Sequence, residues 1–354
     1  MQINLRLPCG GRTVLAACLT LFIQSSFAVA QSYSSNGYTR ENLVTDVSGI
    51  APNSDPNLVN PWGIAALPTS PWWAADEATG LSTIYDGTGV VMSLVVTIPP
   101  TATSTEPTGH PTGIVANSTT DFGGSKFIFA SLDGGISSWA TGTTAVLKVD
   151  NAATAAYTGL TSALRGTANT LYAANFRAGT VEAYDTNFVP VALGQDAFKD
   201  VLLPADFAPF NVQAINGLLY VAFAKRSAEG DEERGPGLGA VDVFTPSGQL
   251  VRRLKHGPYM NAPWGVALAP ADFGDFSNSL LVGQFGSGFI AAFDANTGTF
   301  KGVLKSSDGS PIRIRFLWGI GFGNGGPAGP TNNLYFAAGP RDETHGVFGR
   351  LLPN

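Results

Sequence analysis

The chain has 354 residues, of which 44% are hydrophobic and only 13% charged, and its net charge is −6. With so few charges and no basic run, the composition argues against nucleic acid or an anionic membrane surface as a partner. A length of this size would ordinarily suggest two domains, so the pattern along the chain has to decide the organisation.

The first thirty residues are typical of a signal peptide and are not expected to belong to the fold. Arg6 and Arg12 give a basic start, residues 14–23 are mostly apolar, and an Ala-Val-Ala cleavage motif ends at Ala30. The apolar run is too short for a membrane span. We therefore expect an exported mature chain, residues 31–354, without a transmembrane segment, located in a periplasm or outside the cell.

Both cysteines of the chain, Cys9 and Cys18, lie within this leader. Its removal leaves no disulfide and no thiolate, which excludes cysteine-based metal sites and thiol nucleophiles from the mature chain. A lipoprotein is the alternative, because residues 15–18 (Leu-Ala-Ala-Cys) resemble a lipobox that would leave a lipidated Cys18. Most of the apolar stretch follows Cys18, however, and this favours ordinary cleavage.

A motif related to Pro-Trp-Gly, each time followed by a short apolar strand, recurs six times at nearly constant spacing. The successive steps are 50, 46, 54, 52 and 54 residues between Gly63, Gly113, Gly159, Gln213, Gly265 and Gly319. Within each period, apolar and β-branched segments alternate with Gly, Asp and Asn turns, a pattern typical of consecutive strands. The repeat predicts an all-β fold, a six-bladed β-propeller of four-stranded blades.

The two ends of the chain are expected to share one blade. The last copy of the repeat stops after a strand at 346–351, without a fourth strand, and a strand at 41–47 precedes the first copy without a blade of its own. Pairing the N-terminal segment 38–48 with the last blade would close the ring and cover its open edge. A closed ring makes residues 31–354 a single domain.

Propeller connectivity also predicts which residues share a surface. The residues before the first strand of each blade and after the second strand converge at one mouth of the central channel, where polar side chains are concentrated. The ligand-binding candidates are Asn60, His110, Asn211, Asn261, Asp133, Asn175, Arg177, Lys225, Arg341 and His345. Structural roles compete with a functional one, since Asn60 before Pro61 suits a turn and Asp133-Gly-Gly suits a hairpin.

Two further features have a structural interpretation at this stage. Trp62, Trp264 and Trp318 occupy equivalent positions of the repeat, which favours core packing over a stacking platform. Residues 227–237 form a charged, glycine-bounded loop of the fourth blade that is expected to be solvated and mobile. The sequence contains no nucleophile elbow, His-Glu-x-x-His motif, P-loop, Rossmann fingerprint or EF-hand loop.

The motifs at 60–63 (Asn-Pro-Trp-Gly), 235–239 (Gly-Pro-Gly-Leu-Gly) and 261–265 (Asn-Ala-Pro-Trp-Gly) resemble those of a family of secreted, mostly uncharacterised bacterial proteins similar to NHL-repeat propellers. The resemblance covers the mature chain and implies a six-bladed propeller and export, but no agreed activity. Members of the family often carry His where this chain has Arg177, and a guanidinium has no lone pair to offer a metal.

Two classes of function fit these observations. A binding or scaffold module for a small molecule, glycan or protein segment needs only polar and aromatic groups on a rigid ring. The alternative is a calcium-dependent hydrolase resembling gluconolactonase-like propellers, in which Ca²⁺ at the mouth polarises a carbonyl. Its candidate ligands are Asp76, Asp133, Asn60 and Asn261. Against the hydrolase, no carboxylate precedes an innermost strand, which is where such enzymes need their strongest metal ligand. A lyase with His110 or His345 as general base is a third option.

Overall fold

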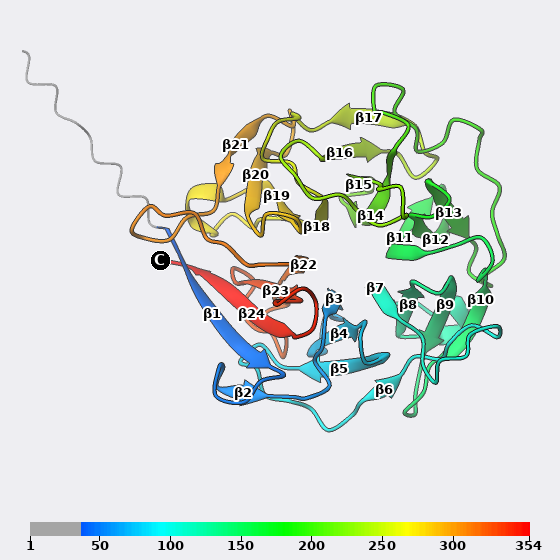
Figure 1. The fold of residues 1–354 in the computed structure, drawn as a ribbon, viewed down its shortest axis with the longest axis horizontal. Coiled ribbons are helices and arrows are strands. Elements are labelled where there is room, and N and C mark those ends of the chain that lie inside the picture. Colours follow the sequence, from blue (N-terminus) through cyan, green and yellow to red (C-terminus); the bar gives the residue numbers. More distant parts are fainter. Residues whose placement is uncertain (1–36) are drawn as a thin grey trace, which may run out of the picture. The chain divides into compact units, whose positions relative to one another are not determined.

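Six β-sheets surround a central channel in the computed structural model, which describes residues 37–354 (Figure 1). The first strand of each sheet lies nearest the channel, and the following strands lie progressively farther out. This arrangement confirms the predicted six-bladed β-propeller. The predicted signal peptide falls outside the described residues.

The strands of most blades follow one another in chain order from the channel outward. Blade 1 consists of β3 (Pro61–Ala65), β4 (Trp72–Asp76), β5 (Leu81–Tyr85) and β6 (Val96–Thr97). Blade 2 consists of β7 (Pro111–Ala116), β8 (Phe127–Ser131), β9 (Gly135–Trp139) and β10 (Val146–Asp150). Blade 4 consists of β14 (Phe207–Ile215), β15 (Leu218–Lys225), β16 (Gly239–Phe244) and β17 (Leu250–Arg253). Blade 5 consists of β18 (Pro263–Leu268), β19 (Ser279–Gln284), β20 (Ile290–Asp294) and β21 (Phe300–Val303).

Blade 3 has three strands instead of the four expected. It contains β11 (Tyr157–Arg165), β12 (Ala168–Asn175) and β13 (Thr180–Tyr184). The segment after β13 forms a single isolated bridge, between Tyr184 and Pro190. A proline has no backbone N–H to donate to a ladder, which helps to explain why no regular fourth strand forms here.

Blade 6 is built from both ends of the described chain and closes the ring. Its inner strands are β22 (Leu317–Phe322), β23 (Leu334–Ala338) and β24 (Val347–Pro353). The N-terminal strand β1 (Tyr38–Thr45) pairs antiparallel with β24, from Tyr38 opposite Pro353 to Thr45 opposite Val347. The short strand β2 (Asn53–Ser54) then adds in parallel to β1 as a fifth strand. The predicted closure by the N-terminal segment is confirmed.

The glycines of the repeat let the inner strands of neighbouring blades approach backbone to backbone. At all five of them, an added Cβ would lie 2.5–2.7 Å from a backbone atom of the next blade: Gly63, Gly113, Gly159, Gly265 and Gly319. Real Cβ atoms do not tolerate such distances, so these positions require glycine. The spacing that marks the blades in the sequence therefore reflects steric contact around the channel.

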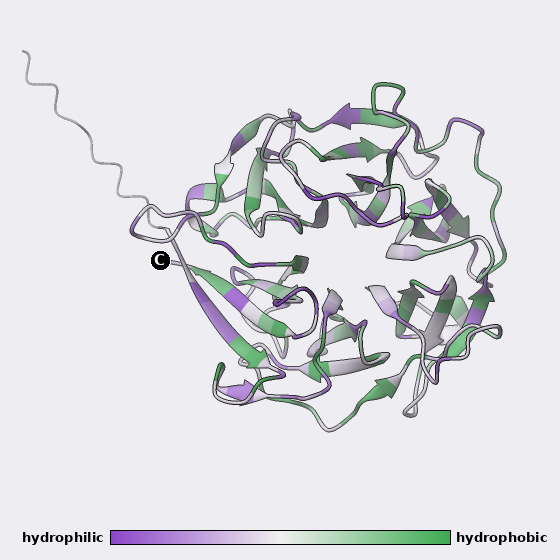
Figure 2. Ribbon diagram, in the orientation of Figure 1, coloured by the Kyte–Doolittle hydropathy of each residue, from purple (hydrophilic) through white to green (hydrophobic). Residues whose placement is uncertain are grey.

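The apolar core is divided among the contacts between blades. Six clusters of buried hydrophobic side chains each lie between two neighbouring blades, including the pair formed by blades 6 and 1. Figure 2 shows hydrophobic residues in all six blades and hydrophilic residues on many of the connections. Among the described residues, no helix is both long and apolar enough to traverse a bilayer.

Candidate functional site

An aromatic plug fills the channel below the predicted mouth. Trp62 and Trp318 stack with their ring centroids 3.5 Å apart, and Trp264 meets both edge-on at about 6 Å. Phe176 and Phe210 pack into the same buried cluster. The interpretation of the three tryptophans as packing residues is confirmed. The indole N–H groups of Trp318 and Trp264 donate to Asn60 and Thr158, whereas that of Trp62 has no acceptor among residues 37–354.

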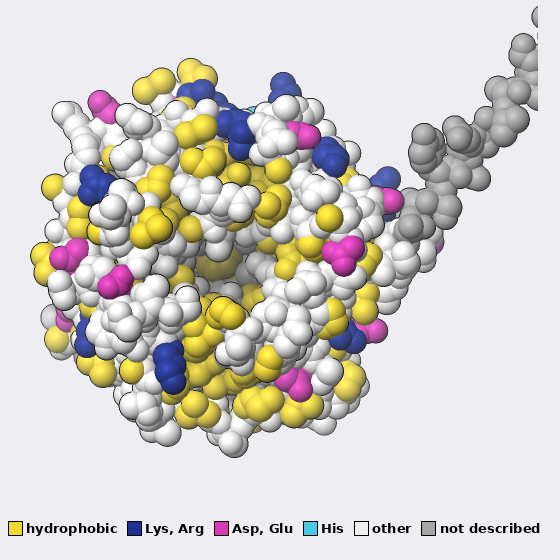
Figure 3. All heavy atoms as spheres, turned by 180° about the vertical axis from the view of Figure 1, so that it is seen from behind, with side chains coloured by type: hydrophobic (Ala, Val, Ile, Leu, Met, Phe, Trp, Pro, Cys, Tyr) yellow, Lys and Arg dark blue, Asp and Glu magenta, His cyan; other side chains and the backbone are white. Residues whose placement is uncertain are grey.

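The plug separates two very different ends of the channel. On the mouth side lies a cavity of about 810 Å³. On the other side the free volume is only about 20 Å³, between inner-strand residues such as Ile114, Val266 and Ile320. Figure 3 shows that second side as a central hollow surrounded by apolar and uncharged atoms, with the charged side chains farther out.

The mouth cavity combines an aromatic floor with a charged rim. Trp62, Phe176 and Phe210 line its base. The charged residues that line it are Arg177, Arg226, Glu229, Asp231, Glu232, Arg234 and Glu343. Most of them belong to the β15–β16 connection, and Glu343 to the β23–β24 connection, which lies beside the channel in Figure 1. The predicted convergence of connections after second strands is therefore found at this cavity.

The charged loop 227–237 lies at the mouth, is exposed over about half of its residues, as expected, and is tethered near both ends. At its start, Arg226 donates from Nη1 to the backbone carbonyls of Phe176 (3.2 Å) and Arg177 (2.7 Å) in blade 3. At its end, the Gly235 N–H donates to Asn261 Oδ1 at 2.8 Å. These contacts span blades 3 to 5, so the loop forms a wall of the cavity.

Arg234 extends the same wall towards blade 6. Its guanidinium lies over the ring of Phe316, 5.1 Å from the centroid, and over that of Phe285 at 5.8 Å. Cation–π contacts of this kind hold an arginine in place without using up its N–H donors. Arg234 therefore keeps its donors available at the rim.

Two carboxyl groups that line the mouth cavity, those of Glu232 and Glu343, have raised pKa values. Burial raises the pKa of Glu232 to about 7, and the nearby charge of Glu343 adds to the effect while Arg234 opposes it. Burial also raises the pKa of Glu343, although a hydrogen bond from Asn60 works against this. Carboxylates that share a partly desolvated site disfavour each other's ionisation. Glu232 can thus exchange a proton near neutral pH.

A hydrogen-bonded chain connects the cavity to His110. Asn60 donates from Nδ2 to Glu343 Oε2 (3.0 Å) and to Glu77 Oε2 (2.8 Å). The other oxygen of Glu77 lies 3.0 Å from His110 Nδ1, and this contact raises the pKa of the imidazole. Asn60 itself is buried, with a left-handed φ of 48°. It positions two carboxylates and is not free to contact a ligand.

The other asparagine candidates also serve local structure. Asn175 accepts from the backbone N–H groups of Ala156 and Ala178. Asn261 holds the end of the charged loop, as described above. The sequence predicted Asn211 at the mouth, and this prediction is wrong. Asn211 lies at the narrow end, where its Nδ2 donates to the Trp264 carbonyl at 2.9 Å. A bulge at Pro209–Asn211 in β14 shifts the register at this point.

Of the remaining ligand candidates, Arg177 lines the cavity. Lys225, Arg341 and His345 do not line it, and their side chains contact other residues of the protein. Lys225 forms an ion pair with Glu233 at 2.7 Å. His345 Nδ1 lies 2.6 Å from Asp46 Oδ2 in the segment that follows β1. Arg341 Nη1 lies 3.4 Å from His345 Nε2.

The proposed metal ligands are not gathered at one point. Asp76 is fully buried and accepts from the N–H and hydroxyl of Thr83, and burial raises its pKa well above the ordinary value. Asp133 accepts from the Thr101 N–H at 2.9 Å. Asn60 and Asn261 have the separate partners described above. Within residues 37–354, no three His, Cys, Asp or Glu side chains are arranged to hold a metal ion.

The predicted ligand-binding set left out four residues that dominate the cavity, Arg226, Glu232, Arg234 and Glu343, although the connectivity placed Glu343 at the mouth. Two signals pointed to them. Arg226 and Glu343 follow second strands, where mouth residues are expected, and the loop that carries Glu232 and Arg234 is bounded by glycines that bring it back to the ring.

No family model matches the chain. Two uncharacterised proteins of Acanthamoeba polyphaga mimivirus are each 29% identical to it, over 294 residues (78% of this chain and 72% of the relative) and over 328 residues (88% and 84%). A third protein from the same source is 32% identical over 206 residues, which span 55% of this chain and 38% of the relative. These relatives give no support to the expected bacterial origin or to secretion.

Solved structures share the fold at low sequence identity. A streptogramin B lyase superposes with a TM-score of 0.55 at 12% identity, covering 91% of this chain and 100% of that chain. Virginiamycin B lyase from Staphylococcus aureus gives 0.53 at 12% identity, covering 89% and 98%. The soluble aldose sugar dehydrogenase from Escherichia coli gives 0.54 at 14% identity, covering 90% and 100%. At such identities the likeness shows the fold alone, because one fold carries many activities.

Proposed function

We propose that this protein binds a small organic ligand in the mouth cavity. The observation that carries the proposal is one cavity of about 810 Å³ that joins an aromatic floor to a rim of arginines and glutamates. Sites for small molecules typically measure about 300–1,000 Å³ and combine apolar walls with a few placed polar groups. The ring positions this cavity rigidly, because its floor belongs to the buried plug.

The rim and floor favour a ligand with two kinds of surface. A flat apolar or sugar face would pack against the aromatic floor, to which Trp62 and Phe210 contribute. Acidic groups of the ligand would meet Arg177 and Arg234, whose guanidinium forks suit carboxylates. Hydroxyl or amine groups would meet Glu232 and Glu343. A small metabolite or a single sugar unit fits this description better than a protein segment.

We also propose that the protein is exported. The support is in the sequence: the basic start, the apolar run at 14–23 and the Ala-Val-Ala motif that ends at Ala30. Expression with the full leader, followed by N-terminal sequencing of the protein outside the cytoplasm, tests this proposal. A mature chain that begins at Gln31 is expected, whereas retention of Met1 in the cytoplasmic fraction would contradict it.

A thermal-shift screen tests ligand binding directly. Free sugars, sugar acids and aromatic carboxylic acids are the probes, because a compound that binds only the native state must raise the melting temperature. We expect hits among the acids, with shifts that Arg177→Ala reduces. The matched control is Arg165→Ala, which removes the same charge at the β11–β12 hairpin. That hairpin lies at the end of blade 3 that faces away from the mouth. Hits that respond equally to both variants would contradict the proposal.

Catalysis at the same mouth is a second candidate, favoured by the proton affinity of Glu232. A carboxyl group with a pKa of about 7 inside a cavity is suited to general acid–base chemistry near neutral pH. Product analysis of each hit would show turnover that Glu232→Gln abolishes while binding persists. A calcium-dependent hydrolase would in addition be stabilised by calcium; an unchanged melting temperature with calcium and with EDTA counts against that mechanism.

A further inference from the structure

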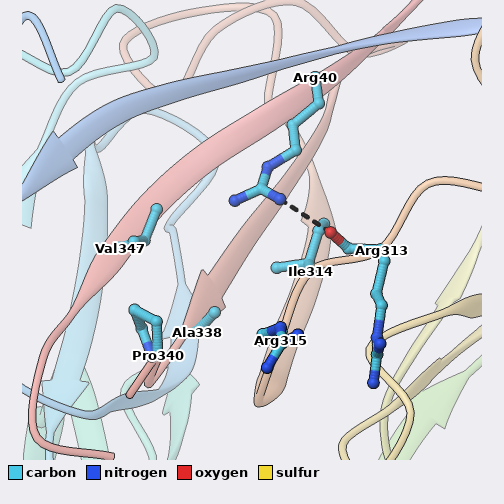
Figure 4. A pocket seen from close by; sticks show the side chains of 7 residues that line it. All are labelled: Arg40, Arg313, Ile314, Arg315, Ala338, Pro340 and Val347. Carbon is cyan, nitrogen blue, oxygen red and sulfur yellow. Dashed lines mark hydrogen bonds between the residues drawn. The ribbon is translucent and has the colours of Figure 1, made fainter. Parts of the chain in front are cut away.

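A second cavity, of about 290 Å³, lies at the seam where the ring closes. Its walls come from β1, from the connection that enters β22, and from the β23–β24 region. They contribute Arg40, Arg315 and an apolar surface that includes Ile314, Ala338 and Val347 (Figure 4). Pairing of the N-terminal strand with blade 6 creates this cavity, which is separate from the mouth cavity and shares no lining residue with it.

Arg40 is fixed in the cavity before any ligand arrives. Its Nε and Nη2 donate to Asn42 Oδ1 at 3.2 and 3.0 Å, and its Nη1 donates to the Arg313 carbonyl at 2.9 Å. A guanidinium has five N–H donors, so these contacts leave one on each terminal nitrogen. Figure 4 shows Arg40 and Arg315 on different sides of Ile314, while Arg313 turns away, towards the Ser287 carbonyl to which its Nε donates.

In the described part of the chain, no carboxylate neutralises Arg40 or Arg315, although two other arginines of the protein are paired. Arg253 pairs with Asp200, and Arg350 pairs with Glu41 at 2.8 Å. Within residues 37–354, neither Arg40 nor Arg315 has a carboxylate within 4.0 Å, and no Asp or Glu lines the cavity. Two unneutralised guanidinium groups beside an apolar wall make this cavity positive in a protein whose net charge is negative.

We propose that this seam cavity binds a tetrahedral oxyanion, a phosphate or sulfate group of a small molecule. Arginine forks bind such groups through paired N–H···O bonds. The two guanidinium groups come from different elements, and a tetrahedral anion offers oxygens in several directions, whereas a carboxylate offers two in one plane. The volume accommodates the anion with a small attached group, since liquid water occupies about 30 Å³ per molecule.

Titration calorimetry of the full chain with inorganic phosphate, sulfate and acetate, at constant ionic strength, tests the proposal. We expect phosphate and sulfate to bind, and acetate to bind at least about tenfold more weakly. Arg315→Gln should weaken phosphate binding about tenfold, and Arg315→Glu should abolish it. Arg315 is exposed and makes no hydrogen bond with residues 37–354, so both variants are expected to fold.

Arg165→Gln is the control for the lost charge and should bind phosphate like the wild type. Glucose 6-phosphate compared with inorganic phosphate distinguishes a phosphate ester from the free anion as the preferred ligand, and glucose alone should not bind at this cavity. The proposal is overturned if the wild type does not bind phosphate in the millimolar range. It is also overturned if acetate binds as tightly, or if Arg177→Ala weakens phosphate binding while Arg315→Gln does not.

Discussion

The two ends of the channel are built from the same six inner strands but differ in size and chemistry. The narrow end is lined by strand residues such as Ile114 and Ile320 and has almost no free volume. The mouth is lined largely by connections and holds a cavity of about 810 Å³ with charges of both signs. The plug of Trp62, Trp264 and Trp318 lies between them.

This difference shows that the repeated strands determine stability, whereas the connections determine the chemistry of the mouth. Strand residues at the narrow end are fixed by contact between blades, since a Cβ at Gly113 would lie 2.5 Å from the Leu160 backbone nitrogen. Connections at the mouth carry no such constraint and can hold whatever side chains a ligand requires. Changes on either side of the plug should therefore affect different properties, stability at one end and binding at the other.

The largest expected effect is on the plug itself. Trp318 is fully buried and stacks on both Trp62 and Phe285. Trp318→Ala should lower the free energy of unfolding by about 3–5 kcal/mol, measured by urea denaturation. It should also open the two ends to each other. A loss below about 1 kcal/mol would mean that the plug does not support the ring.

A smaller loss of stability is expected at the narrow end. Gly265→Ala would place a Cβ 2.5 Å from the Trp318 carbonyl oxygen in the next blade. The two inner strands must then separate, at a cost of about 1–3 kcal/mol. Chemical denaturation measures the cost. Gly194→Ala is the control and should be nearly neutral, because nothing lies within 4 Å of a Cβ at that position.

At the mouth, a change should alter binding and leave stability intact. The Arg177 side chain is exposed and donates one hydrogen bond within the protein, to the Ala152 carbonyl at 3.1 Å. Arg177→Ala should weaken binding of an acidic hit from the screen about tenfold, or about 1.4 kcal/mol. The free energy of unfolding should change by less than about 0.5 kcal/mol. A large loss of stability would make Arg177 a structural residue and remove the contrast between the two ends.

The smallest effect expected is a pH dependence of stability at the mouth. Glu232 has a pKa raised to about 7 in the folded protein, so its ionised form is less favourable there than in the unfolded chain. Stability should therefore fall as pH rises from the ordinary glutamate value through about 7. Glu232→Gln cannot ionise. The full shift of the pKa from 4.5 to about 7 would be worth about 3 kcal/mol, but Glu232 is partly exposed and solvent screens its charge. Relative to the wild type, the variant should therefore gain about 1 kcal/mol between about pH 5 and pH 8. Parallel pH profiles for the two proteins would contradict this.

The fold could be predicted because its constraints are local in sequence. Glycines that must contact the next blade recur at a nearly constant interval. In a closed ring, the extra strand at 41–47 can pair only with the open edge of the last blade. Two departures are local: blade 3 has no regular fourth strand where Pro190 follows β13, and β2 adds as an extra strand to blade 6.

The candidate site was only partly predictable. Connectivity indicated that connections converge around a cavity at the mouth, but Asn60, Asn175 and Asn261 are engaged with backbone groups and carboxylates. An asparagine beside a turn looks the same in a sequence whether it faces a ligand or a neighbouring loop. The packing of the charged loop depends on Arg226 reaching carbonyls about fifty residues away, a contact that no spacing pattern indicates.

The central claim, that the organic ligand found by the screen binds at the mouth and not at the narrow end, is tested most directly by a crystal structure with the tightest-binding compound of the screen. We predict density for the compound in the mouth cavity, against Trp62 and within hydrogen-bond distance of Arg177 or Arg234. Density at the narrow end or on the outer surface, with the mouth cavity empty, would contradict the account.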